Sequence, residues 1–347
     1  MTGIELAERG WLPDRVVRLG IRRMLTGKLA QLQRTDFAGE LSEKECFIRG
    51  LARAPIALVP ELANAQHYEV PARFFELALG RHLKYSSAIW PDGVEDLDRA
   101  EARMLALSCE RAGIENGMTI LDLGCGWGSL SAWIAREYPD CRVLAVSNSK
   151  PQREHLLGRL QAAGLANVEV VTRDMNGFDP GRRFDRIVSV EMFEHMRNWP
   201  ALLGRMAGWL EEDGRAFLHV FCHRDHAYPF EHEGAGNWMG RHFFTGGLMP
   251  SEDMILRCSA DLSVEERWRV SGIHYHRTCE AWLENLDRNA DEALALLSDV
   301  HGADEGAVWL QRWRIFFLAC SELFAFRGGR EWFVSHVRLA PREEAGR

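Results

Sequence analysis

Apolar positions in the middle of the chain follow two alternating spacings. Short apolar runs, typical of buried strands, alternate with stretches of about ten residues that have helical periodicity. This alternation predicts βαβ units and an α/β fold with a parallel, doubly wound sheet. The predicted strands are residues 119–123, 142–146, 168–171, 184–190 and 215–221, and the predicted helices between them are residues 129–137, 151–163 and 200–210.

The chain before and after this core has other patterns. Residues 1–80 have mainly helical periodicity. Residues 223–262 are rich in His, Gly, Pro and aromatic residues and are too long for an ordinary connection, which favours a lid or a pocket wall. Further along we expect strands at residues 264–270 and 331–339 and helices at residues 278–288 and 305–326.

These patterns divide the chain into four parts. Ligands of such a fold bind at the carboxyl ends of the parallel strands, so side chains that directly follow a strand are candidates for binding and catalysis. We expect an N-terminal helical region (1–80), a Rossmann-like ligand-binding core (81–222), a substrate-pocket or lid insertion over the active site (223–262), and a C-terminal part that completes the sheet and the pocket (263–347).

Composition restricts the class of protein. The chain has 347 residues, of which 46% are hydrophobic and 27% are charged, as in ordinary globular domains. A formal net charge of −8 argues against nucleic-acid binding, which favours basic surfaces. The cysteines form no C-x-x-C pair, no apolar run approaches the ~18 residues of a membrane span, and the N-terminus has no apolar signal segment. We therefore expect a cytoplasmic protein.

One predicted helix, residues 15–33, is strongly basic and contains no acidic residue. Such a helix packs its apolar side against its own protein, or it lies on an anionic membrane as a basic amphipathic helix. The pattern leaves both interpretations open, so peripheral membrane contact through this helix remains an alternative. The cations of the helix are Arg15, Arg18, Arg22, Arg23 and Lys28.

A glycine-rich loop, Leu-Asp-Leu-Gly-Cys-Gly-Trp-Gly at residues 121–128, follows the first predicted strand. Glycines let the backbone approach a ligand, and the free N–H groups at the start of the next helix can bind its polar groups. The G-x-G-x-G spacing, with no acidic residue at the end of the second strand, suits a methionine-type cofactor better than a dinucleotide. A purely structural turn is the alternative.

Polar residues near the loop supply candidate contacts for such a cofactor. Asp122 can hold an ammonium group, and Asn148 and Gln152 have amide groups that can hydrogen-bond ribose hydroxyls. After the third strand, Asp174 can accept the amino group of an adenine, and Met175 can pack on the ring. A helix-capping role is the alternative for Asp174.

Three titratable residues, Glu191, Glu194 and His195, follow the fourth predicted strand. Two carboxylates beside an imidazole shift one another's pKa and can provide a base near neutral pH. The alternative is a charged helix start, in which acids meet the helix dipole and His195 has a structural role. Their place at a strand end favours catalysis.

Histidines and aromatic residues further along carry weaker signals. Four histidines and two glutamates between residues 219 and 233 match no zinc spacing, so we expect no metal and assign them to pocket lining. Trp313 and Phe316 share a helix face and form a hydrophobic or cation–π wall for an amine, or they belong to the core. The histidines and glutamates are His219, His223, His226, Glu231, His232 and Glu233.

Together these motifs resemble the S-adenosylmethionine-dependent methyltransferases of the cyclopropane-fatty-acid synthase superfamily. Within it, the coclaurine N-methyltransferase branch is the more similar. The resemblance runs from about residue 82 to residue 338. Its segments are KYSSAIW (84–90), ILDLGCGWGSL (120–130), VSNSKPQ (146–152), SVEMFEHMRNW (189–199), HVFCHRDHAYPFE (219–231), RHFFTGGLMPS (241–251), WRVSGIHYHRT (268–278), WRIFFLACSELFAF (313–326) and GREWFVSHV (329–337).

The resemblance implies a cofactor and a set of site residues. The cofactor is S-adenosylmethionine. The positions that resemble cofactor contacts are Tyr85, Ser86, Gly124, Gly126, Asn148, Gln152 and Asp174. Those linked to catalysis and amine binding are Glu191, Glu194 and His195, and those that line the substrate pocket are Trp313 and Phe316.

Departures from the superfamily pattern separate its two branches. Cyclopropane synthases bind a bicarbonate base through a Cys, a Glu, a His and a Tyr. Glu194 and His219 match this set, but Ser87 stands at the Cys position and Phe316 at the Tyr position. Position 191 is Glu, as in the N-methyltransferases, where the synthases carry Gly. The resemblance therefore favours methylation of an amine, with His219 lining the substrate pocket.

The sequence thus predicts an S-adenosylmethionine-dependent N-methyltransferase that acts on a small, aromatic or hydrophobic amine. Glu194 with His195 would remove or relay the amine proton, and Glu191 would orient and stabilise the ammonium that develops. The alternative is cyclopropane-synthase-like modification of unsaturated phospholipid acyl chains. The expected partner is the small amine, with no nucleic acid, and a homodimer is left open.

Overall fold

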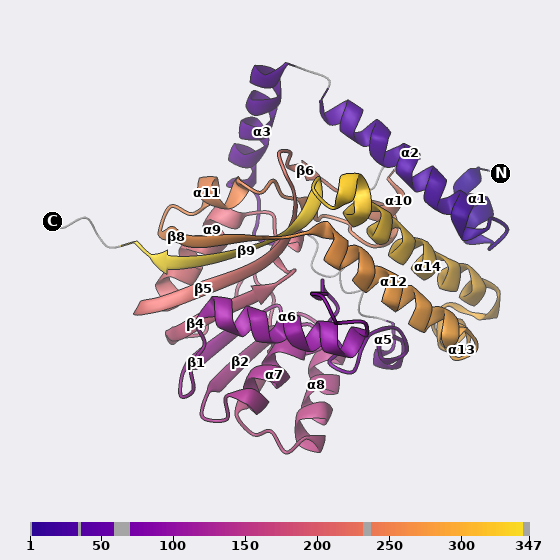
Figure 1. Cartoon of the computed structure of the whole chain (residues 1–347). Helices are drawn as coiled ribbons and strands as arrows, with labels where there is room; N and C mark the ends of the chain where they lie inside the picture. Colours follow the sequence, from indigo (N-terminus) through magenta and orange to yellow (C-terminus); the bar gives the residue numbers. More distant parts are fainter. Residues whose placement is uncertain (1, 34–35, 59–69, 232–236, 343–347) are drawn as a thin grey trace.

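The structure is a computed structural model that describes residues 2–33, 36–58, 70–231 and 237–342. A central twisted sheet carries helices on both faces, and a further group of helices lies beside it (Figure 1). Separate hydrophobic clusters fill the two faces of the sheet and the interior of the helix group. The molecule therefore has a sheet part and a helical part.

The sheet has seven strands in the order β3-β2-β1-β4-β5-β9-β8. Strands β1 to β5 are parallel, whereas β9 runs antiparallel to β5 and β8 runs antiparallel to β9. The predicted doubly wound α/β sheet is confirmed, and the two late strands complete it. The strands are β1 (Thr119–Leu123), β2 (Arg142–Ser147), β3 (Val168–Thr172), β4 (Phe184–Val190), β5 (Leu210–His223), β8 (Leu262–Val270) and β9 (Trp332–Pro341).

Alternate side chains of β1 enter different cores, as the pleat of a strand requires. Ile120 packs into the cluster on one face, and Leu121 and Leu123 pack into the cluster on the other. Three helices cover the first face, and two cover the second. The first set is α6 (Leu97–Ala112), α7 (Ser129–Glu137) and α8 (Lys150–Ala162), and the second is α9 (Trp199–Trp209) and α11 (Met254–Cys258).

The helix group joins the two ends of the chain around an aromatic core. Helix α12 begins six residues before the predicted helix, because the Ser271 side chain accepts a hydrogen bond from Ile273 N and caps an earlier turn. Helices α6 and α13 were not predicted. The group contains α1 (Gly3–Glu8), α2 (Asp14–Leu32), α5 (Ala72–Ala78), α12 (Gly272–Arg288), α13 (Ala290–His301) and α14 (Ala303–Ala325), and α3 (Phe37–Leu51) contacts α11 elsewhere.

The basic helix α2 packs against α14 (Figure 1). Arg18 pairs with Glu280 and Glu322, and Arg22 also pairs with Glu322. Lys28 lies over the Tyr228 ring, 4.6 Å from its centroid. These contacts favour the interpretation that the helix packs on its own protein. No helix in the described part of the chain is long and apolar enough to cross a membrane.

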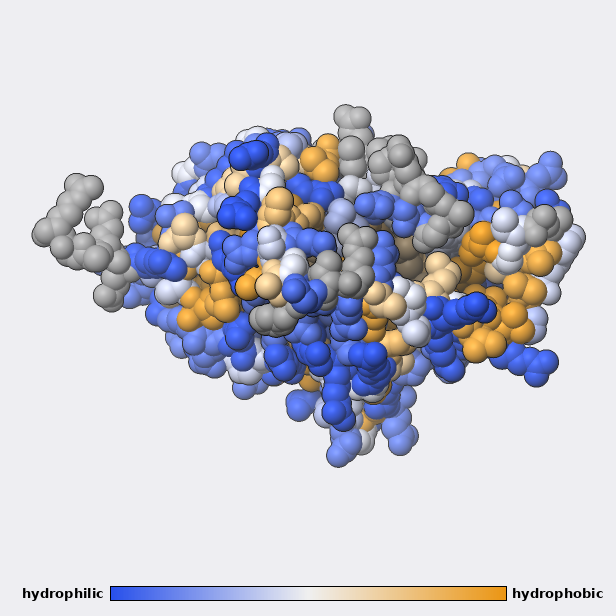
Figure 2. Space-filling view, turned by 90° about the horizontal axis from the view of Figure 1, so that it is seen from above, coloured by the Kyte–Doolittle hydropathy of each residue, from blue (hydrophilic) through white to orange (hydrophobic). Residues whose placement is uncertain are grey.

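Apolar side chains remain exposed at the end of the molecule where α1 and α2 lie (Figure 2). The exposed fraction is 61% for Trp11 and 67% for Leu19. Val16 and Met24 are exposed as well. The outer side of α2 and the connection before it are therefore partly apolar.

The segment from residue 223 to residue 262 contains three short elements before β8 in addition to α11. They are β6 (Tyr228–Pro229), α10 (Trp238–His242) and β7 (Leu248–Met249). Strand β6 pairs antiparallel with β7, so the segment turns back on itself, and β7 contacts β5. His232 and Glu233, two of the residues assigned to pocket lining, lie outside the described residues.

Candidate active site

The glycine loop connects β1 to α7, as predicted, and its backbone requires glycine. Gly124 and Gly126 have φ values of +77° and +53°, a region that other residues rarely adopt. A Cβ at Gly124 would lie 2.4 Å from Met192 Cγ, whereas at Gly126 a Cβ would meet open space. The loop therefore presents bare backbone to a cavity.

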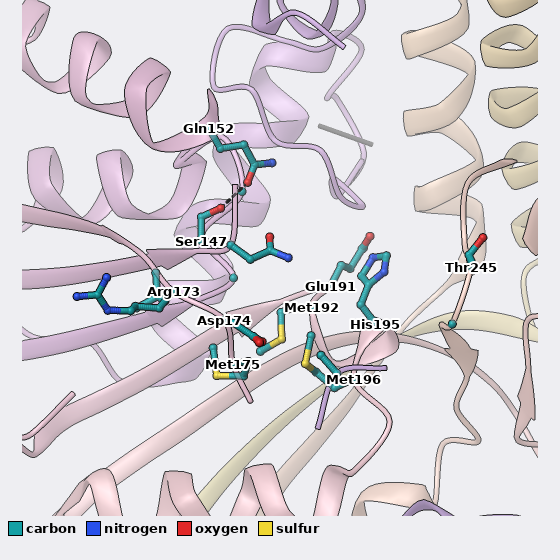
Figure 3. A pocket seen from close by; sticks show the side chains of 16 residues that line it. Ser147, Gln152, Arg173, Asp174, Met175, Glu191, Met192, His195, Met196 and Thr245 are labelled. Atoms are coloured by element: carbon teal, nitrogen blue, oxygen red, sulfur yellow. Dashed lines mark hydrogen bonds between the residues drawn. The ribbon is translucent and has the colours of Figure 1, made fainter. Parts of the chain in front are cut away.

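A first cavity lies at the carboxyl ends of β1, β2, β3 and β4 (Figure 3). It brings together most of the residues that the sequence assigned to the cofactor. A smaller cavity adjoins it behind the loop and is lined by Tyr85, Ser86, Asp122 and Trp127. The predicted residues that line the first cavity are Gly124, Gly126, Asn148, Gln152, Asp174, Met175, Glu191 and His195.

Two buried polar side chains make these cavities suitable for a polar, partly cationic ligand. Asp122 accepts a hydrogen bond from Ser131 Oγ at 2.5 Å, and burial raises the pKa of Asp122 to about 6. Gln152 Oε1 accepts from Ser147 Oγ at 2.7 Å. Among the described residues, Gln152 Nε2 has no hydrogen-bond partner although it is buried. It is thus available to a ligand oxygen, which fits the predicted cofactor.

A second cavity opens on the other side of Glu191 and is lined by apolar side chains of the helix group and of the segment after β5. Glu191 and His195 line both cavities and therefore mark their junction (Figure 3). The remaining lining residues are mostly aromatic. They are Tyr85, Phe221, Phe230, Met239, Phe244, Met249, Tyr275, Trp282, Phe316, Cys320, Leu323 and Phe324.

Glu191 is held in place by hydrogen bonds to both carboxylate oxygens. Oε1 accepts from Ser87 N at 2.9 Å and lies 3.1 Å from His219 Nε2, and Oε2 accepts from the Tyr275 hydroxyl at 2.5 Å. The residue has φ +49°, an uncommon conformation for a residue other than glycine, and its N–H donates to His219 O. Burial raises the pKa of Glu191, and the nearby Lys84 ammonium opposes that rise.

His195 and Glu194 belong to the short helix η1 (Phe193–His195) directly after β4. The His195 ring stacks on Phe244, with centroids 4.8 Å apart, and burial lowers the pKa of His195 to about 4. Glu194 is fully buried behind the cavity wall, where Oε1 accepts from Phe221 N at 2.6 Å. Burial, and then the charge of Glu191, raise the pKa of Glu194 well above its usual range.

These shifts bear on which of the three predicted residues can act as a base near neutral pH. A histidine with a pKa near 4 stays neutral, so it can accept a hydrogen bond without titrating near pH 7. The two carboxyl groups move in the opposite direction, toward neutrality. Glu191 is the carboxyl that reaches the cavities.

Two residues predicted to line the substrate pocket lie one layer behind it. Trp313 is fully buried between Phe74 and Phe243, so its contact with a substrate would run through Phe316, which does line the second cavity. His219 is also fully buried and reaches the site only through Glu191. The Trp313 ring fills space in the aromatic core of the helix group. Helical periodicity alone does not distinguish a ring that packs in a core from one that lines a pocket.

Three other residues predicted to contact the cofactor, Ser86, Asp174 and Met175, lie in the cavity walls. Ser86 Oγ accepts from Lys84 Nζ at 2.5 Å. Asp174 accepts from Asn176 N at 3.0 Å in a local turn that no helix follows, and its neighbour Met175 is buried in the cavity wall. In the described part of the chain, no group of three His, Cys, Asp or Glu side chains is placed to hold a metal ion.

Sequence reasoning missed Tyr275 and Lys84, and it named Ser87 only as the residue at the cysteine position of the synthases. Tyr275 lies in the segment HYHR and Ser87 in KYSSAIW, so both stood within motifs, but only the fold brings them to Glu191. Lys84 is 1% exposed, and burial lowers its pKa to about 8. A lysine in a sequence gives no signal that it will be buried.

Comparison with known proteins shows the family to which the chain belongs. Residues 60–329 match the family described as mycolic acid cyclopropane synthetase. The chain is 33% identical over 333 residues to (S)-coclaurine N-methyltransferase from Papaver somniferum, with 95% of each chain covered. It is also similar to the crystal structure of a coclaurine N-methyltransferase bound to N-methylheliamine and S-adenosylhomocysteine, with a TM-score of 0.93, 35% identity, and coverage of 97% of this chain and 98% of that one.

A cyclopropane synthase from Mycobacterium tuberculosis is similar with a TM-score of 0.68 and 25% identity, over 81% of this chain and 98% of that one. The fold and the relatives define an S-adenosylmethionine-dependent methyltransferase. The chain belongs to the mycolic acid cyclopropane synthetase family. The resemblance to the N-methyltransferase branch, predicted from the motifs, is confirmed.

Proposed function

We propose that the protein methylates the nitrogen of a small, hydrophobic amine bound in the second cavity. The observation that carries this proposal is the junction at Glu191 and His195, where an anionic and a neutral polar group stand between a polar cavity and an aromatic one. An amine needs one polar contact at its nitrogen and apolar contacts elsewhere. The second cavity offers that combination.

The cofactor supplies an activated methyl group on a sulfonium, so the chain's own residues need mainly to position the amine. Asp122, Gln152 and the glycine loop would hold the cofactor in the first cavity and in the smaller one that adjoins it. Tyr85 and Tyr275 line the second cavity, where their electron-rich rings would attract the cationic nitrogen. These contacts favour a small amine carried on an apolar body.

Glu191 has two tasks in this proposal. As a carboxylate it attracts the ammonium form of the amine, and with its pKa raised by burial it can take up the amine proton. His195, kept neutral by burial, would orient the nitrogen by hydrogen bonding. Glu194, buried behind Glu191, would influence the pKa of Glu191 rather than contact the amine. This division differs from the one expected from sequence, which gave proton removal to Glu194 with His195.

Mass spectrometry tests the proposal with a panel of primary, secondary and tertiary amines. The protein should add a mass of one methyl group to at least one aromatic or cyclic amine in the presence of S-adenosylmethionine. Amines of similar pKa that carry a second charge should react far more slowly, because the second cavity has a mainly apolar lining. Methylation of the charged amines in preference to the apolar ones would contradict this use of the cavity.

The loop glycine Gly126 offers a test of cofactor binding. Gly126→Asn keeps a residue that tolerates positive φ but places a side chain into the open space at the loop. The dissociation constant for S-adenosylmethionine, measured by calorimetry, should rise by at least about tenfold, or 1.4 kcal/mol. Gly164→Asn is the matched control, since Gly164 has φ +67° and open space outside the cavities. Equal affinities in the two variants would remove the loop from the cofactor site.

Bicarbonate should have no effect on the rate. In this structure the backbone N–H of Ser87 and the His219 ring both already contact Glu191 Oε1, so the carboxylate occupies groups that a bound anion would need. We expect equal initial rates in carbon-dioxide-free buffer and in buffer with added bicarbonate. A large loss of rate without bicarbonate would instead favour the cyclopropane-synthase mechanism.

A further inference from the structure

A string of hydrogen bonds leads from Glu191 to a guanidinium group outside both cavities. Glu191 Oε1 lies 3.1 Å from His219 Nε2, and His219 Nδ1 lies 2.9 Å from His336 Nε2. His336 Nδ1 lies 2.7 Å from Arg111 Nη1. The two histidines face each other because they are paired residues of the antiparallel strands β5 and β9, and Arg111 reaches them from α6.

Arg111, at the outer end of this string, determines which atom donates and which accepts in each hydrogen bond. A guanidinium only donates hydrogen bonds, so His336 Nδ1 must accept. A neutral His336 then carries its proton on Nε2 and donates to His219 Nδ1. His219 in turn carries its proton on Nε2 and donates to Glu191 Oε1. Each tautomer is therefore fixed by the bond before it.

The surroundings keep both histidines neutral. Each has an exposed fraction of 0%, and burial lowers both pKa values well below the usual range. Lys84 and Arg111 oppose a further positive charge on them, whereas the Glu191 carboxylate, which contacts His219, favours one; burial is the largest cause, and it keeps both rings neutral. A doubly protonated imidazole, which could donate at both ends, is therefore disfavoured, and the direction of the string holds.

We propose that Arg111 and His336 are positioning residues that act through His219 to hold Glu191 as a hydrogen-bond-accepting carboxylate. The proposal deepens the function proposed above and rests on the role of Glu191 given there. The Ser87 N–H and the Tyr275 hydroxyl complete the set of donors around this carboxylate. The other groups that act on its charge are Lys84, His195 and Glu194.

Without the Arg111 guanidinium, His336 Nδ1 would no longer have to accept a hydrogen bond. His336 could then carry its proton on Nδ1, His219 would follow, and the lone pair of His219 Nε2 would face Glu191 Oε1. Two acceptors at 3.1 Å repel each other, so Glu191 would gain by taking up a proton. The protonated acid would no longer attract an ammonium substrate.

The pH dependence of kcat/KM measures this effect in Arg111→Met, which keeps the aliphatic stem of the side chain over Trp268. We expect the acidic limb of the profile to move to higher pH by about one unit, a tenfold change in proton affinity. Arg111→Lys retains a cation that only donates and should restore the wild-type limb. Arg338→Met is the control, because Arg338 also lies over Trp268 and donates to the backbone oxygen of Arg111, but it contacts neither histidine.

A limb that stays in place in Arg111→Met overturns the proposal, and so does a rate that falls equally at every pH, since that is the signature of altered packing alone. Neutron diffraction from wild-type crystals gives a second test that needs neither a variant nor an active enzyme. We expect deuterons on Nε2 of His219 and His336, and none on their Nδ1 atoms or on Glu191. A deuteron on either Nδ1 or on the carboxylate contradicts the proposal, whereas a failure to methylate amines would contradict only the proposed function.

Discussion

Replacing Glu191 by glutamine should lower kcat/KM for the amine by about 10²–10³-fold, the usual cost of losing a general base or a charge that meets the transition state. Glutamine is similar in size. Its Oε1 can still accept from Ser87 N, while its Nε2 would donate to the Tyr275 oxygen. The substitution removes the negative charge at the junction of the two cavities and the only group proposed to take the amine proton. Affinity for the cofactor, measured by calorimetry, should stay within about threefold, or 0.7 kcal/mol.

The pH profile makes this prediction more specific. The pKa of Glu191 is raised by burial, so activity should fall as the pH drops through that raised value and the carboxylate takes up a proton. In Glu191→Gln this limb should disappear. Glu331→Gln is the matched control, since Glu331 has a side chain as deeply buried as Glu191 but contacts Arg327 away from both cavities. Equal losses in the two variants would mean that only the neutralisation of a buried carboxylate matters.

Replacing His195 by alanine should lower kcat by about 10²-fold and leave the acidic limb of the profile where it is. Burial holds the pKa of His195 near 4, so the imidazole has no titration between about pH 5.5 and 9 to contribute. Its loss removes a neutral hydrogen-bonding group beside the amine and the ring that stacks on Phe244. Steady-state kinetics over that pH range, with two amines of different pKa, measures both effects.

The stacking contact needs its own control. His301→Ala removes another imidazole that stacks on an aromatic ring, that of Trp309 at 4.3 Å between centroids, within the helix group. It should leave kcat near the wild-type value. A profile for His195→Ala that loses its acidic limb would return the role of the base to the imidazole.

The sequence predicted the sheet because its signals are local. The strands β1 to β4 are short runs bounded by a turn or a helix start, and β1 begins and ends at the predicted residues. Strand β5 begins five residues before its predicted start, in a polar stretch. Helix α6 escaped prediction although it has clear local signals: Asp96 caps its first turn, and Gly113 ends it with φ +64°. Its apolar residues are interrupted by charged ones, so the helical periodicity is less clear than in the helices between the parallel strands.

The site shows a different limit of sequence reasoning. The residues at strand ends, such as Gly124, Asn148 and Glu191, could be assigned because the topology of an α/β sheet fixes where strand ends meet. Orientation could not be assigned. Glu191 and Glu194 are three residues apart, yet one faces both cavities and the other is buried behind them, because the chain leaves β4 with a left-handed residue.

Contacts between segments that are far apart in the sequence could not be predicted either. Tyr275 comes from α12 and Ser87 from the chain before α6, and they meet on one carboxylate only after the helix group packs against the sheet. Trp313 shows the reverse case: its aromatic character suggested a pocket wall, and packing against Phe74 and Phe243 placed it inside the core. Tertiary packing thus decides which aromatic residue reaches a ligand.

Partition of a labelled methyl group is the most direct test of the central claim. The protein is incubated with S-adenosylmethionine labelled on its methyl group, tetrahydroisoquinoline as a cyclic aromatic secondary amine, and vesicles of unsaturated phospholipid in the same tube. We expect the label in the N-methylated amine, a loss of that label in Glu191→Gln, and none in the acyl chains. Label that accumulates in the phospholipid while the amine stays unmethylated would contradict the account.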